Sequence, residues 1–246
     1  MLAILGGSGL TQLSALTETR RISARTAFGE PSGPLTLGRI GGREVIFLAR
    51  HGDAHTIPPH QVNYRANIQA LKDAGAKQIA SVATVGGIRR EFGPGALVVP
   101  HQIIDYTWGR RSTFFEGGDV PVSHVDFTRP YSEPLRQKLL AAARASGEPL
   151  LDGAVYAATQ GPRLETAAEI DRLERDGADV VGMTGMPEAA LARELDLPYA
   201  AIAVVVNHAA GRGESRTGIR LERIEQMLHS TIGRARRIVE ELAALA

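Results

Sequence analysis

The 246-residue sequence contains no cysteine. The absence of thiols excludes disulfide bonds, thiolate metal sites and a cysteine nucleophile. A run of about 18 apolar residues, the length that crosses a bilayer as a helix, is also missing. The opening stretch, Met1 to Leu5, lacks the basic segment of a secretory signal and runs directly into glycines. These absences lead us to expect a cytoplasmic protein that does not bind membranes.

Neither sign of charge is in excess, since the formal net charge is +1 at pH 7. The arginine clusters at 110–111 and 234–237 are short and are typical of solvated surface, so a nucleic-acid partner has little support. Hydrophobic residues make up 43% of the chain, which is typical of a globular protein. We predict one domain spanning residues 1–246.

Buried-type apolar runs alternate with segments of helical periodicity along the chain. The predicted strands are 2–5, a hairpin over 34–50, 79–84, 94–100, 154–159, 180–182 and 199–206, and the predicted helices are 62–71, 134–146, 167–175 and 219–245. This alternation predicts an α/β fold with a mixed central β-sheet covered by helices on both faces. Residues 105–133 are polar with little periodicity, and a loop of that length is usually functional or a partner surface.

Asn207 follows the buried run Val204 to Val206, where a loop of small residues begins. Ligands of α/β proteins bind at the carboxyl ends of strands. An amide offers donors on one atom and an acceptor on the other, which suits a flat ring with an oxo group beside a protonatable nitrogen. The alternative is an ordinary turn or helix-capping role for Asn207.

Two further strand ends suit an anion. After the first strand, Gly6 to Leu10 forms a turn in which backbone N–H groups and the Ser8 hydroxyl can close on an anion. The turn lacks the third glycine of a dinucleotide fingerprint and a Walker lysine, and an ordinary tight turn is the alternative. Arg50 and His51 end the hairpin, and they suit a phosphate through a forked charged donor and a second ring donor.

Other interpretations of Arg50 and His51 are open. A metal site formed by His51, His55 and His60 is disfavoured because the prolines at 58–59 prevent one helix from carrying all three. Pairing with surface carboxylates is a second alternative. Three more strand ends carry ligand-like groups, namely Thr84, Glu165 and Met183 with Thr184. Six such strand ends argue for one common site.

Several blocks together resemble the trimeric purine nucleoside phosphorylase and methylthioadenosine phosphorylase family. The blocks are Gly6 to Leu10, Arg50-His51-Gly52, His55, Val62 to Ile68, Gly161-Pro162-Arg163 and Met183 to Glu188. The resemblance implies a single-domain, distorted-barrel sheet and phosphorolysis, in which inorganic phosphate attacks C1′ of a nucleoside. It implies no cofactor besides phosphate, no metal, and a homotrimer. The 105–133 segment is then a candidate subunit contact, with His124 reaching a neighbouring site.

The resemblance also implies roles for individual residues. Ser8, Arg50, His51 and Thr184 match the family's phosphate ligands, with the backbone at Thr84 assisting, and Met183 matches the residue under the ribose. In the base pocket, Glu165 and Asn207 match the 6-oxopurine enzymes. The methylthioadenosine branch has aspartates where this chain has Asn207 and Ala209. His208 either reaches the sugar or faces solvent.

Hydrogen-bond chemistry agrees with a 6-oxopurine. Hypoxanthine presents N1–H, which Glu165 can accept, and O6, to which the Asn207 amide can donate. As the glycosidic bond breaks, N7 gains a proton and the Asn207 carbonyl can accept it. Adenine would set its bare N1 against the carboxylate. A mismatched polar edge can be rejected by roughly 10⁴-fold.

The 5′ substituent of the nucleoside distinguishes two close predictions, a methylthio-nucleoside substrate and an ordinary nucleoside with a 5′-hydroxyl. Leu164 stands where an aromatic residue is usual in the family, and no partner for a 5′-hydroxyl aligns in residues 212–232. The 50–67 block and the compact length resemble the methylthioadenosine branch more than the longer inosine-cleaving one. This resemblance leads us to predict phosphorolysis of S-methyl-5'-thioinosine to hypoxanthine and 5-methylthioribose 1-phosphate, with catalytic roles for Asn207, Arg50 and His51. The alternatives are a general inosine and guanosine phosphorylase or a methylthioadenosine phosphorylase. Rival classes are a nucleoside hydrolase and a non-enzymatic nucleoside-binding regulator.

Overall fold

The computed structural model describes residues 1–118 and 120–245, so Asp119 in the 105–133 segment and Ala246 at the end of the predicted domain lie outside the described residues. The strands are β1 (Leu2–Gly6), β2 (Thr17–Ile22), β3 (Leu35–Ile40), β4 (Arg43–Ala49), β5 (Gln78–Gly87), β6 (Leu97–Val99), β7 (Gln102–Asp105), β8 (Leu151–Asp152), β9 (Val155–Ala158), β10 (Val180–Gly182) and β11 (Tyr199–His208). The helices are η1 (Pro59–Gln61), α1 (Tyr64–Asp73), α2 (Glu133–Ala145), α3 (Ala167–Arg175), α4 (Gly185–Glu194), η2 (Gly213–Ser215) and α5 (Leu221–Leu245).

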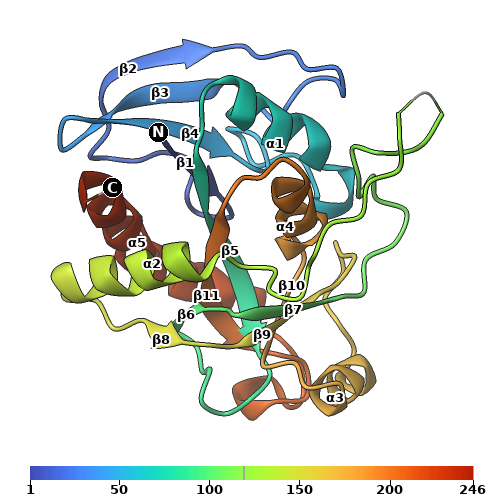
Figure 1. Cartoon of the computed structure of the whole chain (residues 1–246). Coiled ribbons are helices and arrows are strands. Elements are labelled where there is room, and N and C mark those ends of the chain that lie inside the picture. Colours follow the sequence, from blue (N-terminus) through green and yellow to red (C-terminus); the bar gives the residue numbers. More distant parts are fainter. Residues whose placement is uncertain (119, 246) are drawn as a thin grey trace.

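The strands form one mixed sheet that branches at β5. Its main path runs β2-β3-β4-β1-β5-β10-β9-β7, while β11 pairs with β5 and β6, and β6 pairs with β8. The central pairs of β1 with β4 and β5, and of β5 with β11, are parallel, whereas β10 meets β5 antiparallel. This confirms the predicted mixed sheet. The branch is visible at the centre of Figure 1, where β5 and β11 lie side by side.

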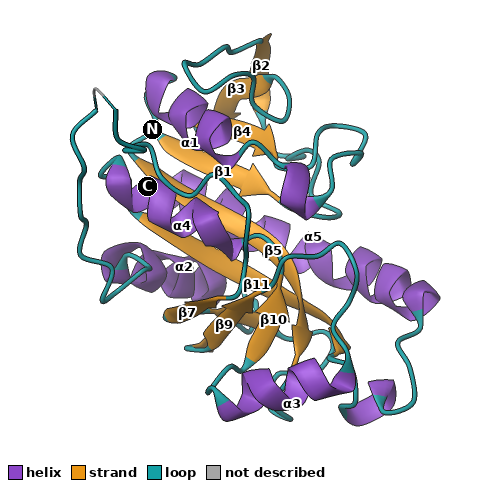
Figure 2. Cartoon of the chain, turned by 90° about the vertical axis from the view of Figure 1, so that its right-hand side faces the viewer, coloured by secondary structure: helices purple, strands orange, loops and turns teal. Residues whose placement is uncertain are grey.

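Helices cover both faces of the sheet because the central strands are apolar on both sides. In β1, Leu2 and Ile4 belong to one core cluster, while Ala3 and Leu5 belong to another. The first cluster is closed by α2 and α5 and the second by α1 and α4, which lie to the left and right of β5 in Figure 1. Helix α3 closes a third cluster beside β9 and β10 (Figure 2).

Most predicted elements are confirmed, including the 34–50 hairpin with its Gly41-Gly42 turn. The sequence missed β2, β7 and β8. Every residue of β2 is exposed, so this edge strand shows no alternation of apolar and polar side chains. Two boundaries were also wrong. Strand β5 continues to Gly87, so Thr84 lies inside the strand and not at its end. Strand β11 continues to His208, so Asn207 lies within the strand and not after it.

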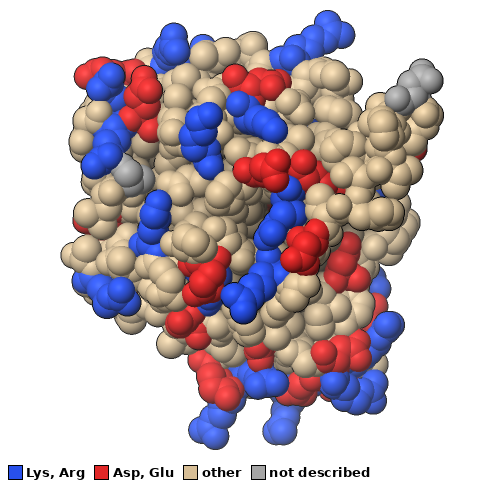
Figure 3. Space-filling model, in the orientation of Figure 1, with Lys and Arg blue, Asp and Glu red and all other residues tan. Residues whose placement is uncertain are grey.

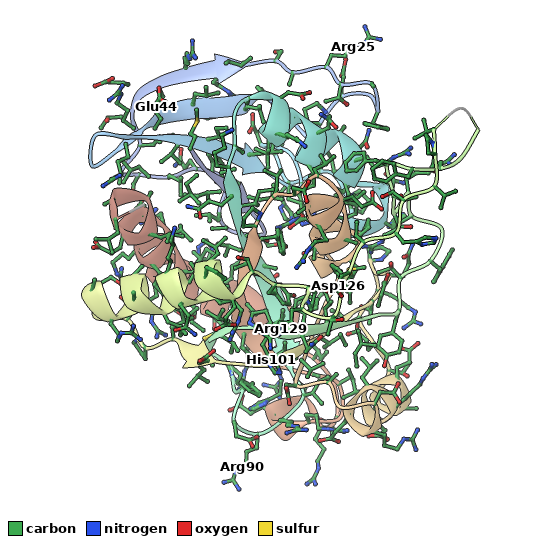
Figure 4. The ribbon with its side chains drawn as sticks, viewed as in Figure 1. Arg25, Glu44, Arg90, His101, Asp126 and Arg129 are labelled. Atoms are coloured by element: carbon green, nitrogen blue, oxygen red, sulfur yellow. The ribbon has the colours of Figure 1, made fainter. Side chains whose placement is uncertain are left out.

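The surface carries both signs of charge. On the face shown in Figure 3, basic and acidic side chains alternate instead of gathering by sign. Arg25, Glu44 and Arg90 point outward from opposite ends of the molecule (Figure 4). None of the helices within the described residues is long and apolar enough to cross a membrane.

Candidate active site

A cavity of about 390 Å³ collects nearly all of the predicted site residues. It is lined by Ser8, Arg50, His51, Thr84, Leu164, Glu165, Met183, Thr184, Asn207 and Ala209, together with Gly7, the segment 55–59, Val206, Ile219 and Ile224. These residues come from β5, β10, β11, the loops that follow β1, β4, β9, β10 and β11, and the start of α5. The volume is in the range of small-molecule sites.

A β-bulge places Asn207 in this cavity. The register of β11 against β5 runs Val205 with Val85 and then Asn207 with Gly86, so Val206 is an extra residue. Bulges of this kind re-aim side chains and occur beside active sites. The Asn207 Nδ2 atom donates to the carbonyl of His208 at 2.6 Å, which fixes the orientation of the amide. Its Oδ1 and its second N–H are then left for a ligand.

His208 is not brought to the cavity with the other predicted residues. Its ring lines a neighbouring hollow with Pro94, Ser215 and Met227. It packs so closely on the next turn that a Cβ on Gly213 would lie 2.4 Å from the His208 ring. The bulge turns Asn207 toward the cavity, and the following side chain faces away from it. His208 therefore does not line this cavity, and the predicted contact between His208 and the substrate is wrong in this structure.

Glu165 is held by Thr159, a residue for which the sequence suggested no role. The Thr159 hydroxyl donates to Glu165 Oε1 at 2.6 Å and lies 3.3 Å from the carbonyl oxygen of Gly182. Since a hydroxyl has one proton, that proton fixes which carboxylate oxygen faces the protein. The other oxygen, Oε2, is left to accept from a ligand.

Arg50 is fully buried and its forked donor faces Glu188, not the cavity. Arg50 Nε donates to Glu188 Oε2 at 2.7 Å and Nη2 donates to Oε1 at 3.0 Å. Nη2 also donates to Ser81 Oγ at 2.6 Å, and Nη1 donates to the Val82 carbonyl at 3.0 Å. The predicted forked recognition of phosphate is therefore wrong in this structure. Of the five N–H groups, one on Nη1 remains without a partner among the described residues.

Glu188 completes a buried network that the sequence did not reveal. It has 0% relative exposure and also accepts from Ser81 Oγ at 3.1 Å and from the Tyr199 hydroxyl at 2.7 Å. Burial alone would lower the pKa of Arg50, but the Glu188 carboxylate raises it above its ordinary value. The available signal was a lone acid among the small and apolar residues at the start of α4.

The glycine before Ser8 is explained by close packing. A Cβ on Gly7 would lie 2.5 Å from the Val82 carbonyl oxygen and 2.8 Å from Arg50 Nη1. Only glycine lets the backbone approach the guanidinium this closely. Ser8 itself lines the cavity, and its hydroxyl lies 3.4 Å from His55 Nε2.

His51 is a neutral ring whose proton is on Nδ1. That nitrogen lies 2.8 Å from the carbonyl oxygen of Ile57, which can only accept. Burial and the adjacent Arg50 charge lower the pKa of His51 to about 4, against the opposing effect of the Ile57 hydrogen bond. Nε2 is therefore an acceptor at neutral pH, which corrects the prediction of a second ring donor.

Thr184 stands at the start of α4 and lines the cavity beside Met183. Its side chain makes no capping bond to the helix, so the hydroxyl is available to a ligand. His124 is exposed and does not line the cavity. Among the described residues, no group of three or more His, Asp or Glu side chains is placed to hold a metal ion.

Comparison with known proteins identifies the class to which this fold and site belong. A model of the phosphorylase superfamily matches residues 1–244. The chain therefore belongs to the phosphorylase superfamily and is an enzyme of that superfamily.

Two relatives and one solved structure place it more closely. It is 56% identical over 234 residues, 95% of this chain and 94% of the relative, to a protein of Pseudomonas syringae pv. tomato named "Probable S-methyl-5'-thioinosine phosphorylase". It is 47% identical over 215 residues, 85% of this chain and 80% of the relative, to the 6-oxopurine nucleoside phosphorylase of Pyrococcus furiosus. A methylthioadenosine phosphorylase of Schistosoma mansoni in complex with adenine superposes with a TM-score of 0.93 at 32% identity, covering 99% of this chain and 91% of that chain.

Proposed function

We propose that the protein cleaves S-methyl-5'-thioinosine with inorganic phosphate, giving hypoxanthine and 5-methylthioribose 1-phosphate. The observation that carries the proposal is one cavity lined by Glu165 and Asn207 as well as by Ser8, Arg50 and Thr184. The first pair can pair with the edge of a 6-oxopurine, and the second set can hold an oxyanion.

In this proposal Glu165 and Asn207 read the base. Thr159 occupies Glu165 Oε1, so Oε2 accepts from purine N1–H. The Asn207 amide, oriented by its bond to the His208 carbonyl, donates to O6 and accepts from N7–H. The N7–H bond forms fully only as the leaving purine gains its proton, so it stabilises the transition state more than the substrate.

Phosphate is held by one charged donor and several neutral ones. The free N–H of the Arg50 guanidinium and the hydroxyls of Ser8 and Thr184 supply them, with the backbone at Thr84 assisting. His51 Nε2 accepts from a protonated phosphate oxygen. Phosphate is already a nucleophile, so the site acts by holding it against C1′ and by stabilising the cationic sugar. No cofactor besides phosphate is needed.

The 5′ substituent meets an apolar wall. Leu164, Ile219 and Ile224 line the cavity, and they favour a methylthio group over a hydroxyl. A general 6-oxopurine nucleoside phosphorylase is the second candidate, because the Pyrococcus furiosus relative carries that name. Both candidates share the base edge and differ only at the 5′ end.

The proposal includes a cytoplasmic homotrimer assembled through the 105–133 segment. Trp108 and Val122 in this segment have 72% and 69% relative exposure. Large apolar side chains with this much exposure are candidates for burial in a subunit contact. Sedimentation equilibrium of the purified protein, compared with a Val122→Lys variant, tests the trimer, and a monomeric wild-type protein would contradict it.

One side-by-side assay tests the proposed reaction. Initial rates are measured with methylthioinosine, methylthioadenosine and inosine, each with and without phosphate. We expect turnover only with phosphate and the highest kcat/KM with methylthioinosine. Equal turnover without phosphate would indicate a hydrolase, and a preference for inosine would indicate the general phosphorylase.

A further inference from the structure

Arg110 is a charged side chain of the 105–133 segment that is not exposed like its neighbours. In Figure 1 this segment, drawn in green, passes α4 and α1 on the right of the molecule. Arg110 is half-buried, whereas the adjacent Arg111 has 73% side-chain exposure and pairs with Glu116 at 2.8 Å. No carboxylate among the described residues pairs with Arg110. Its charge must therefore be balanced by neutral acceptors.

Those acceptors belong to segments that form the cavity. Arg110 Nη1 donates to the carbonyls of Met183 at 2.8 Å and Met186 at 2.6 Å. Nη2 donates to the carbonyls of Gln160 at 2.8 Å and Thr159 at 3.2 Å, and Nε donates to Gln160 Oε1 at 3.2 Å. The first two carbonyls follow β10 and the others follow β9.

Arg110 is also connected, through Tyr64, to a third segment that lines the cavity. Arg110 Nη1 lies 3.2 Å from the Tyr64 hydroxyl oxygen, and that hydroxyl donates to the Pro59 carbonyl at 2.9 Å. Pro59 lines the cavity. The guanidinium also lies over the Tyr64 ring, 5.4 Å from its centre, in a cation–π contact.

The backbone around these carbonyls explains why an outside donor is required. Met186 has non-helical φ and ψ angles of −119° and 141° inside α4, so its carbonyl is available to a donor outside the helix. Half-buried carbonyls without a donor cost free energy. A planar guanidinium with five donors can serve several at once, which an ammonium cannot.

We propose that Arg110 is a positioning residue that fixes the distance between the wall that reads the base and the wall that holds the sugar and phosphate. It acts through Gln160 and Thr159 on the Glu165 loop, and through Met183 on the Met183-Thr184 corner. Arg110 does not itself line the cavity. This inference rests on the proposed function, because it assumes that the cavity binds the nucleoside.

The test uses Arg110→Ala and Arg110→Lys, with Arg111→Ala as the matched control from the same surface segment. Displacing reacting groups by about 1 Å can cost about 100-fold in rate. We expect both Arg110 variants to lose at least tenfold in kcat/KM for methylthioinosine, about the lower end of that effect. The KM for the nucleoside should rise, and the KM for phosphate should rise less, because Thr184 is one of several phosphate ligands. Arg111→Ala should match the wild type.

Two further readouts separate positioning from general stability. Millimolar guanidinium, far below denaturing concentrations, should restore turnover in Arg110→Ala but not in Arg110→Lys. Hypoxanthine binding, followed by fluorescence of the single tryptophan, Trp108, should weaken in parallel. The backbone N–H of Trp108 donates to Gln160 Oε1 at 3.1 Å, so this residue is joined to the Gln160 segment.

Two results would overturn the inference. One is wild-type kcat/KM in Arg110→Ala; the other is loss of activity with unchanged KM values and no recovery in guanidinium. If the wild type and Arg111→Ala themselves show no phosphate-dependent turnover, the proposed function fails instead.

Discussion

Replacing Glu165 with glutamine should strongly weaken the preference for a 6-oxopurine over a 6-aminopurine. Thr159 Oγ donates to Glu165 Oε1 at 2.6 Å, and in Glu165→Gln the remaining carbonyl oxygen keeps that bond. The new NH₂ group then takes the place of Oε2 and faces the base. It opposes the N1–H of a 6-oxopurine but can donate to the bare N1 of a 6-aminopurine.

The size of the effect follows from the bonds exchanged. A 6-oxopurine loses a charge-assisted hydrogen bond and gains two opposed donors, about 3 kcal/mol or on the order of 100-fold in kcat/KM. A 6-aminopurine gains one neutral hydrogen bond, about 1 kcal/mol or roughly fivefold. The ratio of kcat/KM for methylthioinosine to that for methylthioadenosine should therefore fall by about 500-fold.

The assay measures both substrates at saturating phosphate, with Glu174→Gln on the surface of α3 as the matched control. Glu174 pairs with Arg212 at 2.7 Å and does not line the cavity. The control should keep the wild-type ratio. A wild-type ratio in Glu165→Gln would refute the assignment of Glu165 to N1. Thr159→Val, which frees Oε1, should lower the ratio less than Glu165→Gln does, and Thr159→Ser should keep it.

Three further predictions concern the base edge, the buried network and pH. Asn207→Asp combined with Ala209→Asp should shift the substrate ratio toward 6-aminopurines by about 10- to 100-fold, below the roughly 10⁴-fold of a fully built polar edge; an unchanged ratio would argue against these positions. Glu188→Ala leaves Arg50 buried without its counter-ion and should lower the free energy of unfolding by about 3–5 kcal/mol in urea titrations; a loss below about 1 kcal/mol would show that the pair is not essential. Native His51 has a pKa near 4 against an ordinary 6.5, so the unfolded chain binds more protons between those values and stability falls as the pH drops through them. Relative to His51→Asn, the wild type should lose about 3 kcal/mol from pH 6.5 to 4, and parallel stability curves would exclude the depressed pKa.

Much of the site could be predicted because chemistry-bearing residues follow apolar runs. Parallel strands bring their carboxyl ends to one edge of a sheet, and Ser8 and Arg50, which follow the parallel strands β1 and β4, line one cavity. Glu165 and Thr184 follow β9 and β10, and they line the same cavity although β10 runs antiparallel to β5. The edge strand β2 was missed because its exposed side chains carry no periodic signal. The role of each atom could not be read from the sequence, because it depends on partners remote in the chain.

The sequence by itself determined the alternation of strands and helices, the apolar character of both faces of β1 and β4, and the set of residue types at the strand ends. Only the tertiary structure decided how those residues are used. Glu188, 138 positions from Arg50 in the chain, accepts the hydrogen bonds of the Arg50 guanidinium. The extra residue Val206 turns Asn207 toward the cavity, while His208 faces away from it. Periodicity records which face of a strand is buried, whereas hydrogen-bond partners and a one-residue bulge are set by how distant segments pack together.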